Sequence, residues 1–301
     1  MNNKTKSWFL LFLLAIIWGS SFILMEKSMI DSSGNKLLSA NEVASLRMFI
    51  SGLVMISVFL KNLKIAFSKD WIWFFLVGLL GNLIPAFLFT NAQKTLSSSF
   101  TGTLNSLVPI FAVLVAVFVF KQKLTAKAFL GVILGFTGTI ALIYFNNGEF
   151  DKIAVTPTLL VVLATICYAF SLNIIKNKLN HASSMAITGI SLIFIMIPAI
   201  FVILQENTIE KIGNPVYTEA FGYILILSLV CTTFALIIFN QLIKMTTSIF
   251  ASSVTYLIPI VAIMWGIYFN EKITWAFLFI GLTLIGIYIV KKEEGKRIEK
   301  K

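Results

Sequence analysis

Long apolar runs recur along the whole chain, and short polar segments separate them. Ten of these runs come close to the roughly 20 residues that a helix needs to cross a bilayer. They are Trp8–Met25, Val43–Leu60, Trp71–Phe89, Phe100–Phe120, Ala126–Phe145, Leu159–Ile175, Met185–Leu204, Phe221–Phe239, Ile249–Phe269 and Ile273–Val290. The runs are continuously apolar and do not alternate, which favours helices over a β-barrel. The pattern therefore predicts an all-α integral membrane protein with ten transmembrane helices.

The second half of the chain repeats the first at an offset of 150 residues. The clearest identities pair Lys94, Ser98, Phe100, Leu107, Pro109, Ile110 and Ala112 with Lys244, Ser248, Phe250, Leu257, Pro259, Ile260 and Ala262. Each copy contains five predicted spans, and an odd number of crossings turns the second copy upside down in the bilayer. We therefore expect two inverted five-helix repeats, at residues 1–147 and 152–290, followed by a charged tail at 291–301.

Composition and charge agree with a membrane protein. Hydrophobic residues make up 58% of the chain and charged residues 12%, whereas soluble domains carry about a quarter charged residues. With the N-terminus inside, 17 of the 24 Lys and Arg residues fall in the predicted inner segments, which places both termini in the cytoplasm. The net charge of +11 thus indicates topology in a cell membrane and contact with lipid headgroups, not a nucleic-acid partner.

Ionisable groups are nearly absent from the predicted spans. All 13 acidic residues lie in loops, in the tail or at span ends, and the single histidine, His181, lies in a loop. The spans contain no cluster of metal ligands, no phosphate-binding glycine loop and no nucleophile beside a base. The sequence therefore predicts that the protein is not an enzyme and that it uses no metal and no cofactor.

Neutral polar residues form stripes within the apolar spans. Ser98, Thr101 and Asn105 share one helix face at spacings i, i+3 and i+7. In lipid such groups must face another helix or water, so they serve either in helix–helix hydrogen bonds or in the lining of a cavity. The candidates for a substrate cavity are Trp18, Ser21, Asn82, Thr101, Asn105, Tyr168, Thr232, Asn240, Thr255 and Tyr256.

Prolines and a few charges complete the candidate features. Pro85, Pro109 and Pro259 lie within spans, where each removes a backbone donor and can bend its helix. Arg47 lies about one turn inside the second span; it either snorkels to the outer interface or binds a substrate carboxylate at a cavity mouth. The other candidates for gating or charge are Glu26, Lys94 and Lys244, and the two lysines could equally be interface anchors.

Local strings resemble the EamA-type permeases of the drug/metabolite transporter superfamily. Ala15-Ile16-Ile17-Trp18-Gly19-Ser20-Ser21-Phe22 is similar to the Trp-Gly-Ser opening of that family, and Arg47-Met48-Phe49 to its second span. Asn270-Glu271-Lys272-Ile273 is similar to the family's Gly-Glu-Arg-Leu element. The first half departs there with Lys121-Gln122-Lys123-Leu124, and the sixth span departs with Tyr168-Ala169-Phe170.

The resemblance implies a helical basket whose central cavity opens alternately to each side of the membrane. It also implies efflux or exchange of small metabolites, such as amino acids, or of drug-like compounds. Because the first span lacks a central carboxylate, facilitated diffusion or exchange coupled elsewhere fits better than carboxylate-driven proton exchange. A membrane enzyme, a lipid scramblase, a receptor or a channel are the alternatives, and the chain is expected to be a monomer or a homodimer.

Overall fold

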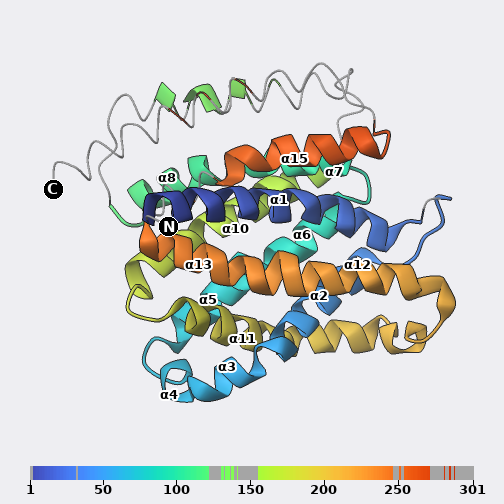
Figure 1. Ribbon diagram of the computed structural model, residues 1–301, viewed down its shortest axis with the longest axis horizontal. Coiled ribbons are helices and arrows are strands. Elements are labelled where there is room, and N and C mark those ends of the chain that lie inside the picture. The colour runs from blue at the N-terminus through green and yellow to red at the C-terminus, as the bar shows by residue number, and fades with distance from the viewer. Residues whose placement is uncertain are drawn as a thin grey trace.

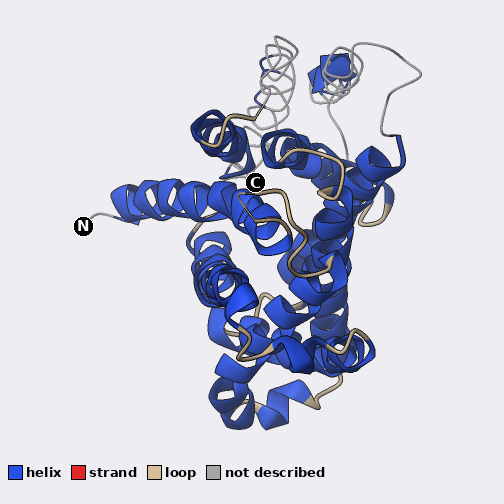
Figure 2. Ribbon diagram, turned by 90° about the vertical axis from the view of Figure 1, so that its right-hand side faces the viewer, coloured by secondary structure: helices blue, strands red, loops and turns tan. Residues whose placement is uncertain are grey.

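The structure is a computed structural model. All secondary-structure elements of more than two residues in its described part are helices. The described residues are 3–31, 33–121, 155–246 and 254–271, with isolated positions at 130–141, 251, 281, 285 and 288. The helices run along the long axis of the molecule (Figure 1), and Figure 2 shows many of them nearly end-on. The all-α class is confirmed. The predicted spans Ala126–Phe145 and Ile273–Val290 fall largely outside the described residues, so the count of ten stays a prediction.

The described helices follow the predicted spans closely. In the first half they are α1 (Asn3–Met29), α2 (Ala40–Val54), α3 (Ile56–Lys61), α4 (Leu63–Ala66), α5 (Trp71–Gly78), the π-helical η1 (Leu79–Leu83), α6 (Ile84–Ala92), α7 (Ser98–Leu104), the 3₁₀ turn η2 (Asn105–Leu107) and α8 (Val108–Phe118). In the second half they are α10 (Val155–Lys178), α11 (Ser184–Gln205), the 3₁₀ turns η4 (Thr208–Lys211) and η5 (Pro215–Tyr217), α12 (Thr218–Ser228), the π-helical η6 (Leu229–Phe234), α13 (Ala235–Met245) and α15 (Val254–Tyr268).

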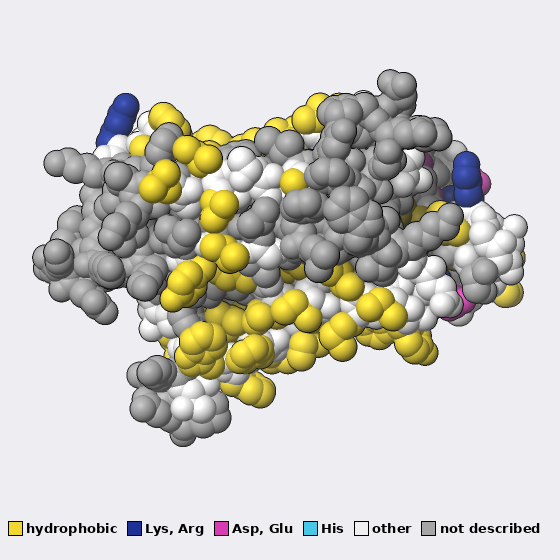
Figure 3. Space-filling model, turned by 90° about the horizontal axis from the view of Figure 1, so that it is seen from above, with side chains coloured by type: hydrophobic (Ala, Val, Ile, Leu, Met, Phe, Trp, Pro, Cys, Tyr) yellow, Lys and Arg dark blue, Asp and Glu magenta, His cyan; other side chains and the backbone are white. Residues whose placement is uncertain are grey.

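Six continuous helical segments are long and apolar enough to cross a membrane. They are Thr5–Met29, Trp71–Ala92, Ser98–Phe118, Val155–Lys178, Ser184–Gln205 and Pro215–Met245. Figure 3 shows hydrophobic side chains spread along the middle of the visible described surface, while the visible Lys and Arg side chains lie toward its two ends. An apolar belt between charged ends matches a bilayer between two aqueous phases, so the protein is a multi-pass membrane protein.

Serine residues start several of these helices. The Ser39 side chain accepts a hydrogen bond from the Glu42 backbone, and the Glu42 side chain accepts one from the Ser39 backbone, which completes a capping box. Ser97 and Ser183 cap α7 and α11 in the same position, by accepting from Phe100 N and Ala186 N. The first N–H groups of a helix have no partner within the helix. These serines therefore define where the chain turns into each helix.

A polar network ties the start of α2 to the segment that follows α11. The Lys211 ammonium lies 2.7 Å from the Glu42 carboxylate, and Glu42 is fully buried. Ser39 and Asn41 donate to the Glu206 carboxylate at 3.0 Å each. Because a buried carboxylate needs a cation and hydrogen-bond donors to stay charged, this network holds one end of the first half against the second half.

A glycine lets α5 approach α11 closely. A Cβ atom at Gly78 would lie 2.4 Å from the Ser191 carbonyl oxygen and 2.8 Å from Ile195 Cγ2. Both distances are shorter than any normal contact, and the first is to backbone, which cannot rotate away. Gly78 is therefore required for the spacing of these two helices, as small residues are in many membrane interfaces.

Gly78→Val is expected to lower the stability of the protein by about 1–3 kcal/mol, the usual cost of overpacking a filled interior. Gly222→Val in α12 is the matched control, because a Cβ atom there meets nothing within 4 Å. Thermal unfolding of both variants in the same detergent measures the difference. Equal midpoints for the two variants would contradict a tight α5–α11 contact.

Candidate functional site

A cavity lies between the two halves of the chain. Its volume, counted as the space open to the centre of a water-sized sphere, is about 110 Å³. Its lining comes from α1, α2, the α5–η1–α6 segment and α7–η2–α8 in the first half, and from α10, α11, η6, α13 and α15 in the second. The predicted candidates on this lining are Trp18, Ser21, Asn82, Asn105, Tyr168, Thr232, Asn240 and Thr255, together with Arg47. The structure therefore brings most of the proposed cavity residues together, and their role in transport stays a prediction.

Two π-helical turns border the cavity at equivalent places in the two halves. Turn η1 begins at Leu79 and turn η6 begins at Leu229, which is the repeat offset of 150 residues. Turn η1 contributes Gly81 and Asn82 to the lining, and η6 contributes Cys231 and Thr232. A π-helical turn widens the helix, leaves carbonyl groups without their usual partners and is frequent at functional sites. The sequence pattern did not predict either turn.

Side chains from α1 and α2 donate hydrogen bonds to backbone carbonyl groups around η6. Ser51 donates to Ser228 O at 3.0 Å, and the Trp18 indole donates to Cys231 O at 3.1 Å. The Thr232 hydroxyl donates to Leu227 O at 2.8 Å, five residues earlier. These hydrogen bonds satisfy backbone carbonyl groups, which cannot bond to bulk water inside a membrane. They also attach the second half to the first beside the cavity.

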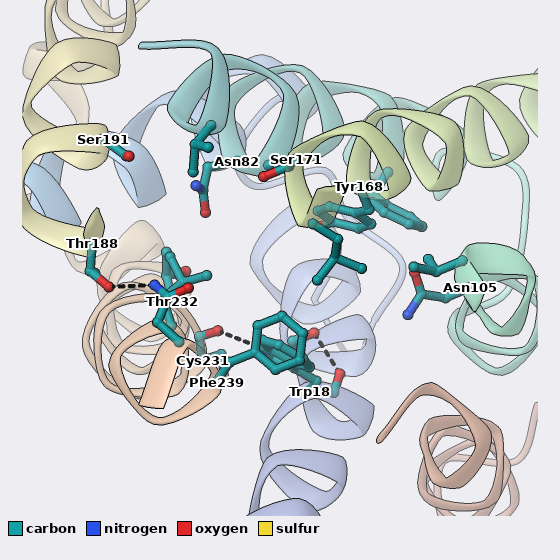
Figure 4. Close-up of a pocket in the computed structure, with 18 of the residues that line it drawn as sticks. Trp18, Asn82, Asn105, Tyr168, Ser171, Thr188, Ser191, Cys231, Thr232 and Phe239 are labelled. Atoms are coloured by element: carbon teal, nitrogen blue, oxygen red, sulfur yellow. Dashed lines mark hydrogen bonds between the residues drawn. The ribbon is translucent and has the colours of Figure 1, made fainter. Parts of the chain in front are cut away.

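Amide side chains supply the polar part of the lining. Figure 4 shows Asn82 and Asn105 pointing toward the same central space from different helices. Asn240 donates to Thr188 Oγ1 at 2.9 Å. The Oδ1 atoms of Asn105 and Asn240 are buried and have no partner among the described residues. An amide oxygen normally accepts hydrogen bonds, so each of these atoms is an unused acceptor on a residue that lines the cavity.

Aromatic rings supply the apolar part. The rings of Trp18 and Phe239 meet edge to face with their centroids 4.8 Å apart. The rings of Phe89 and Tyr168 stack with centroids 5.8 Å apart. Such rings present flat apolar surfaces and can also face a cation. The cavity thus suits a solute that has both polar and apolar parts.

Arg47 is the one formally charged residue among those described around the cavity. It lies on α2 and is half-buried. Its Nε atom donates to Thr232 Oγ1 at 2.6 Å, and its Nη1 atom lies 3.7 Å from Met25 Sδ. The Arg47 side chain thus faces the cavity, whereas a snorkelling side chain would extend toward the membrane interface. An ionisable group inside a membrane protein is a default candidate for function.

Several predicted residues lie away from the cavity lining. Thr101 is buried and donates back to Ser97 O at 2.9 Å, so its hydroxyl serves its own helix. Tyr256 packs instead against the apolar cluster of Leu107, Ile110 and Val113. Lys94 and Lys244 are exposed, and Lys244 donates to Ala182 O. The structure does not bring these four residues into contact with the space where a solute would lie.

Glu26 also lies off the lining, beside a second carboxylate. Ser98 N donates to Glu26 Oε2 at 3.2 Å and to Glu271 Oε1 at 3.1 Å. The Ser99 backbone N–H donates to Glu271 Oε2 at 3.1 Å. Both carboxylates therefore meet at the start of α7, where the helix presents free backbone N–H groups. Glu271 belongs to the string that resembles the family's Gly-Glu-Arg-Leu element, and its contact with Glu26 could not be predicted from the sequence.

The three candidate bends have different surroundings. Pro85 follows the π-helical turn η1, and Pro109 follows the 3₁₀ turn η2, so each lies where the helix changes its winding. Pro259 lies inside α15, which is α-helical on both sides of it. The repeated prolines therefore do not share the same local helix geometry, and a matched pair of gates at Pro109 and Pro259 stays a prediction.

Sequence reasoning missed part of the lining. Thr188 and Ser191 lie one turn apart on α11 and face the cavity, as Figure 4 shows. Their i, i+3 spacing in an apolar run is the same signal that marked Ser98 and Thr101, so it could have been used. Cys231 and Phe239 carry no such signal, because a buried thiol and a phenyl ring are common in any apolar span.

Membrane-spanning helices that enclose a polar cavity between two halves are typical of a multi-pass transporter. The model of the EamA-like transporter family matches residues 5–144 and 156–291. The chain therefore belongs to the EamA-like transporter family, and it is a membrane transporter of small molecules.

Two relatives and one solved structure cover nearly the whole chain. An uncharacterized transporter of Archaeoglobus fulgidus is 24% identical over 96% of this chain and 99% of its own length. An S-adenosylmethionine/S-adenosylhomocysteine transporter of Chlamydia muridarum is 24% identical over 96% of this chain and 92% of its own length. One crystal structure aligns with a TM-score of 0.63 at 15% identity, over 98% of this chain and 99% of that one. The two relatives are named as transporters, and the solved structure, at 15% identity, supports the fold alone.

Asn105→Leu is expected to lower the initial rate of transport while leaving thermal stability unchanged or raised. The substitution removes a buried oxygen that has no partner among the described residues, and a buried polar group without a partner costs about 1–3 kcal/mol. Asn177→Leu is the control, because Asn177 is exposed near the end of α10 and lies outside the lining. Uptake into proteoliposomes and unfolding midpoints measure the two effects. A large loss of stability with a normal rate would show that Asn105 is structural.

Proposed function

We propose that the protein is a secondary carrier that moves small amino-acid-like or amphipathic metabolites out of the cell, or exchanges them, by alternating access. The observation that carries the proposal is the cavity itself, which combines amide oxygens, hydroxyl groups and aromatic rings from both halves. Such a lining can bind a solute with polar and apolar parts without a metal, a cofactor or a catalytic group.

The same proposal assigns ten spans in two inverted repeats, with both termini in the cytoplasm. Three observations support it: the sequence identities at an offset of 150 residues, the π-helical turns at the same offset, and the match of the family model to two segments of the chain. Inverted repeats place a binding site at their interface and let one half rock against the other. A cavity lined by both halves of the chain is a further observation that supports this arrangement.

The Chlamydia relative suggests which solutes to test first. That relative is named as a transporter of S-adenosylmethionine and S-adenosylhomocysteine. Both compounds combine an amino-acid end with an aromatic base, and the cavity offers polar groups beside aromatic rings. At 24% identity the substrate does not transfer with the fold, so these two compounds are members of a panel that also contains free amino acids.

Transport in this proposal does not require a proton gradient. Purified protein in liposomes preloaded with amino acids should exchange them with external labelled amino acids at the same rate with and without an imposed pH gradient. Glu26→Gln should keep this exchange, because Glu26 lies off the cavity lining and contacts Ser98 and Glu271. Protein-free liposomes provide the control for leakage. Uphill accumulation that follows the pH gradient and disappears in Glu26→Gln would overturn the uncoupled mechanism.

The inverted topology predicts the location of two reporter fusions. A reporter fused after Gly148 follows five predicted spans and should lie outside the cytoplasm, so alkaline phosphatase should be active there and a green fluorescent protein dark. A reporter fused after Lys301 follows ten spans and should behave in the opposite way. Equal behaviour of the two fusions would contradict a five-plus-five arrangement.

A further inference from the structure

We infer that Arg47, held by Thr232 of the π-helical turn η6, is the binding point for a carboxylate group of the transported solute. The inference rests on the proposed function and narrows it to solutes that carry a carboxylate. It requires three structural features. The guanidinium group must have a fixed orientation, some of its N–H donors must be free to bind a ligand, and the cavity must accept the rest of the solute.

Thr232 fixes the orientation of the guanidinium group. Its hydroxyl donates to Leu227 O at 2.8 Å, which leaves the oxygen lone pairs to accept from Arg47 Nε at 2.6 Å. The hydroxyl can bond in this direction because the π-helical turn places it against the carbonyl five residues earlier. Met25 Sδ lies 3.7 Å from Nη1 on the other side. An oriented guanidinium group can bind a carboxylate through two parallel hydrogen bonds.

Most of the donors of Arg47 remain for a ligand. A guanidinium group has five N–H donors, and those with partners in the described part of the chain are one on Nε and one on Nη1. The ion pairs found among the described residues join Glu42 with Lys211 and Asp70 with His181, and neither involves Arg47. Because no carboxylate in the described part of the chain pairs with this cation, a solute anion can neutralise it at the cavity.

The rest of the lining fits the rest of such a solute. Asn105 and Asn240 are 6% and 4% exposed, and each has an amide oxygen without a partner among the described residues. These oxygens accept hydrogen bonds, so they suit an ammonium or amide N–H of the solute and not a second anion. The Trp18 and Phe239 rings cover its apolar part. A zwitterionic amino acid with a large side chain carries a carboxylate, N–H donors and an apolar part, which are the kinds of group that this lining can bind.

The test measures whether a carboxylate protects Arg47 from chemical modification. The chain contains two arginines, Arg47 and Arg297 in the tail. The protein is treated with phenylglyoxal in nanodiscs and then digested, and mass spectrometry of the peptides follows modification at each arginine separately. Arg297 serves as the internal reference for the reagent. The probes are L-phenylalanine and L-phenylalaninamide, which differ in the carboxylate alone.

L-Phenylalanine is expected to slow the modification of Arg47 but not of Arg297. The amide should need a concentration roughly tenfold or more higher for the same protection, because hydrogen bonds to charged groups are the strong ones. Thr232→Val should weaken the protection by the acid roughly 3- to 10-fold, whereas Thr232→Ser, which keeps the hydroxyl, should retain it. Lys36→Gln, which removes an exposed cation outside the lining, should leave it unchanged.

Several results would overturn the inference. Equal protection by the acid and the amide, or the absence of protection by the acid in the unmutated protein, means that Arg47 does not bind the carboxylate; neither result depends on a variant that has to fold. Uptake of labelled L-phenylalanine into proteoliposomes is measured in parallel. Uptake without protection rejects the carboxylate site and leaves the carrier function in place, whereas protection without uptake supports the site and counts against the carrier function.

Discussion

The structure depends on one constraint: a polar group inside the membrane must find a partner within the protein. A π-helical turn leaves carbonyl groups without their usual partners, and Ser51 and Trp18 from the first half donate to Ser228 O, just before η6, and to Cys231 O within it. Because the unpaired groups would have no water to bond in hydrocarbon, the two halves are held together at this turn. The cavity lies directly beside that contact, and Trp18 belongs both to the contact and to the cavity lining.

The cavity combines a neutral polar lining with one cation. Amides and hydroxyl groups cost less to bury than charges, and they can be left partly unsatisfied until a solute arrives. The Oδ1 atoms of Asn105 and Asn240 have no hydrogen-bond partner among the described residues. Arg47 is held by Thr232, and no carboxylate among the residues that the structure describes pairs with it, which keeps its charge available. Under the proposed function, a site of this kind selects a solute by completing hydrogen bonds.

The two halves are similar in sequence but not identical in local structure. Their π-helical turns match at the repeat offset. However, a 3₁₀ turn precedes Pro109, whereas α15 stays α-helical around Pro259. Glu271 contacts the start of α7, whereas the corresponding string in the first half, Lys121-Gln122-Lys123-Leu124, contains no acidic residue. A carrier made of two unequal halves can bind an unsymmetrical solute, because each half presents different groups to it.

The sequence alone determined the all-α membrane class, the approximate extent of the described spans and the kind of residue that lines the cavity. These features follow from hydropathy, from the repeat of 150 residues and from the cost of polar groups in lipid, all of which are local or periodic properties of the chain. The tertiary structure decided which polar residues meet. Trp18 bonds to a carbonyl 213 residues away, Arg47 pairs with Thr232 across the interface between the halves, and Thr101, with the same helical spacing as Asn105, bonds to its own helix. Pairings of this kind depend on how helices from distant parts of the chain pack, and no local pattern contains that information.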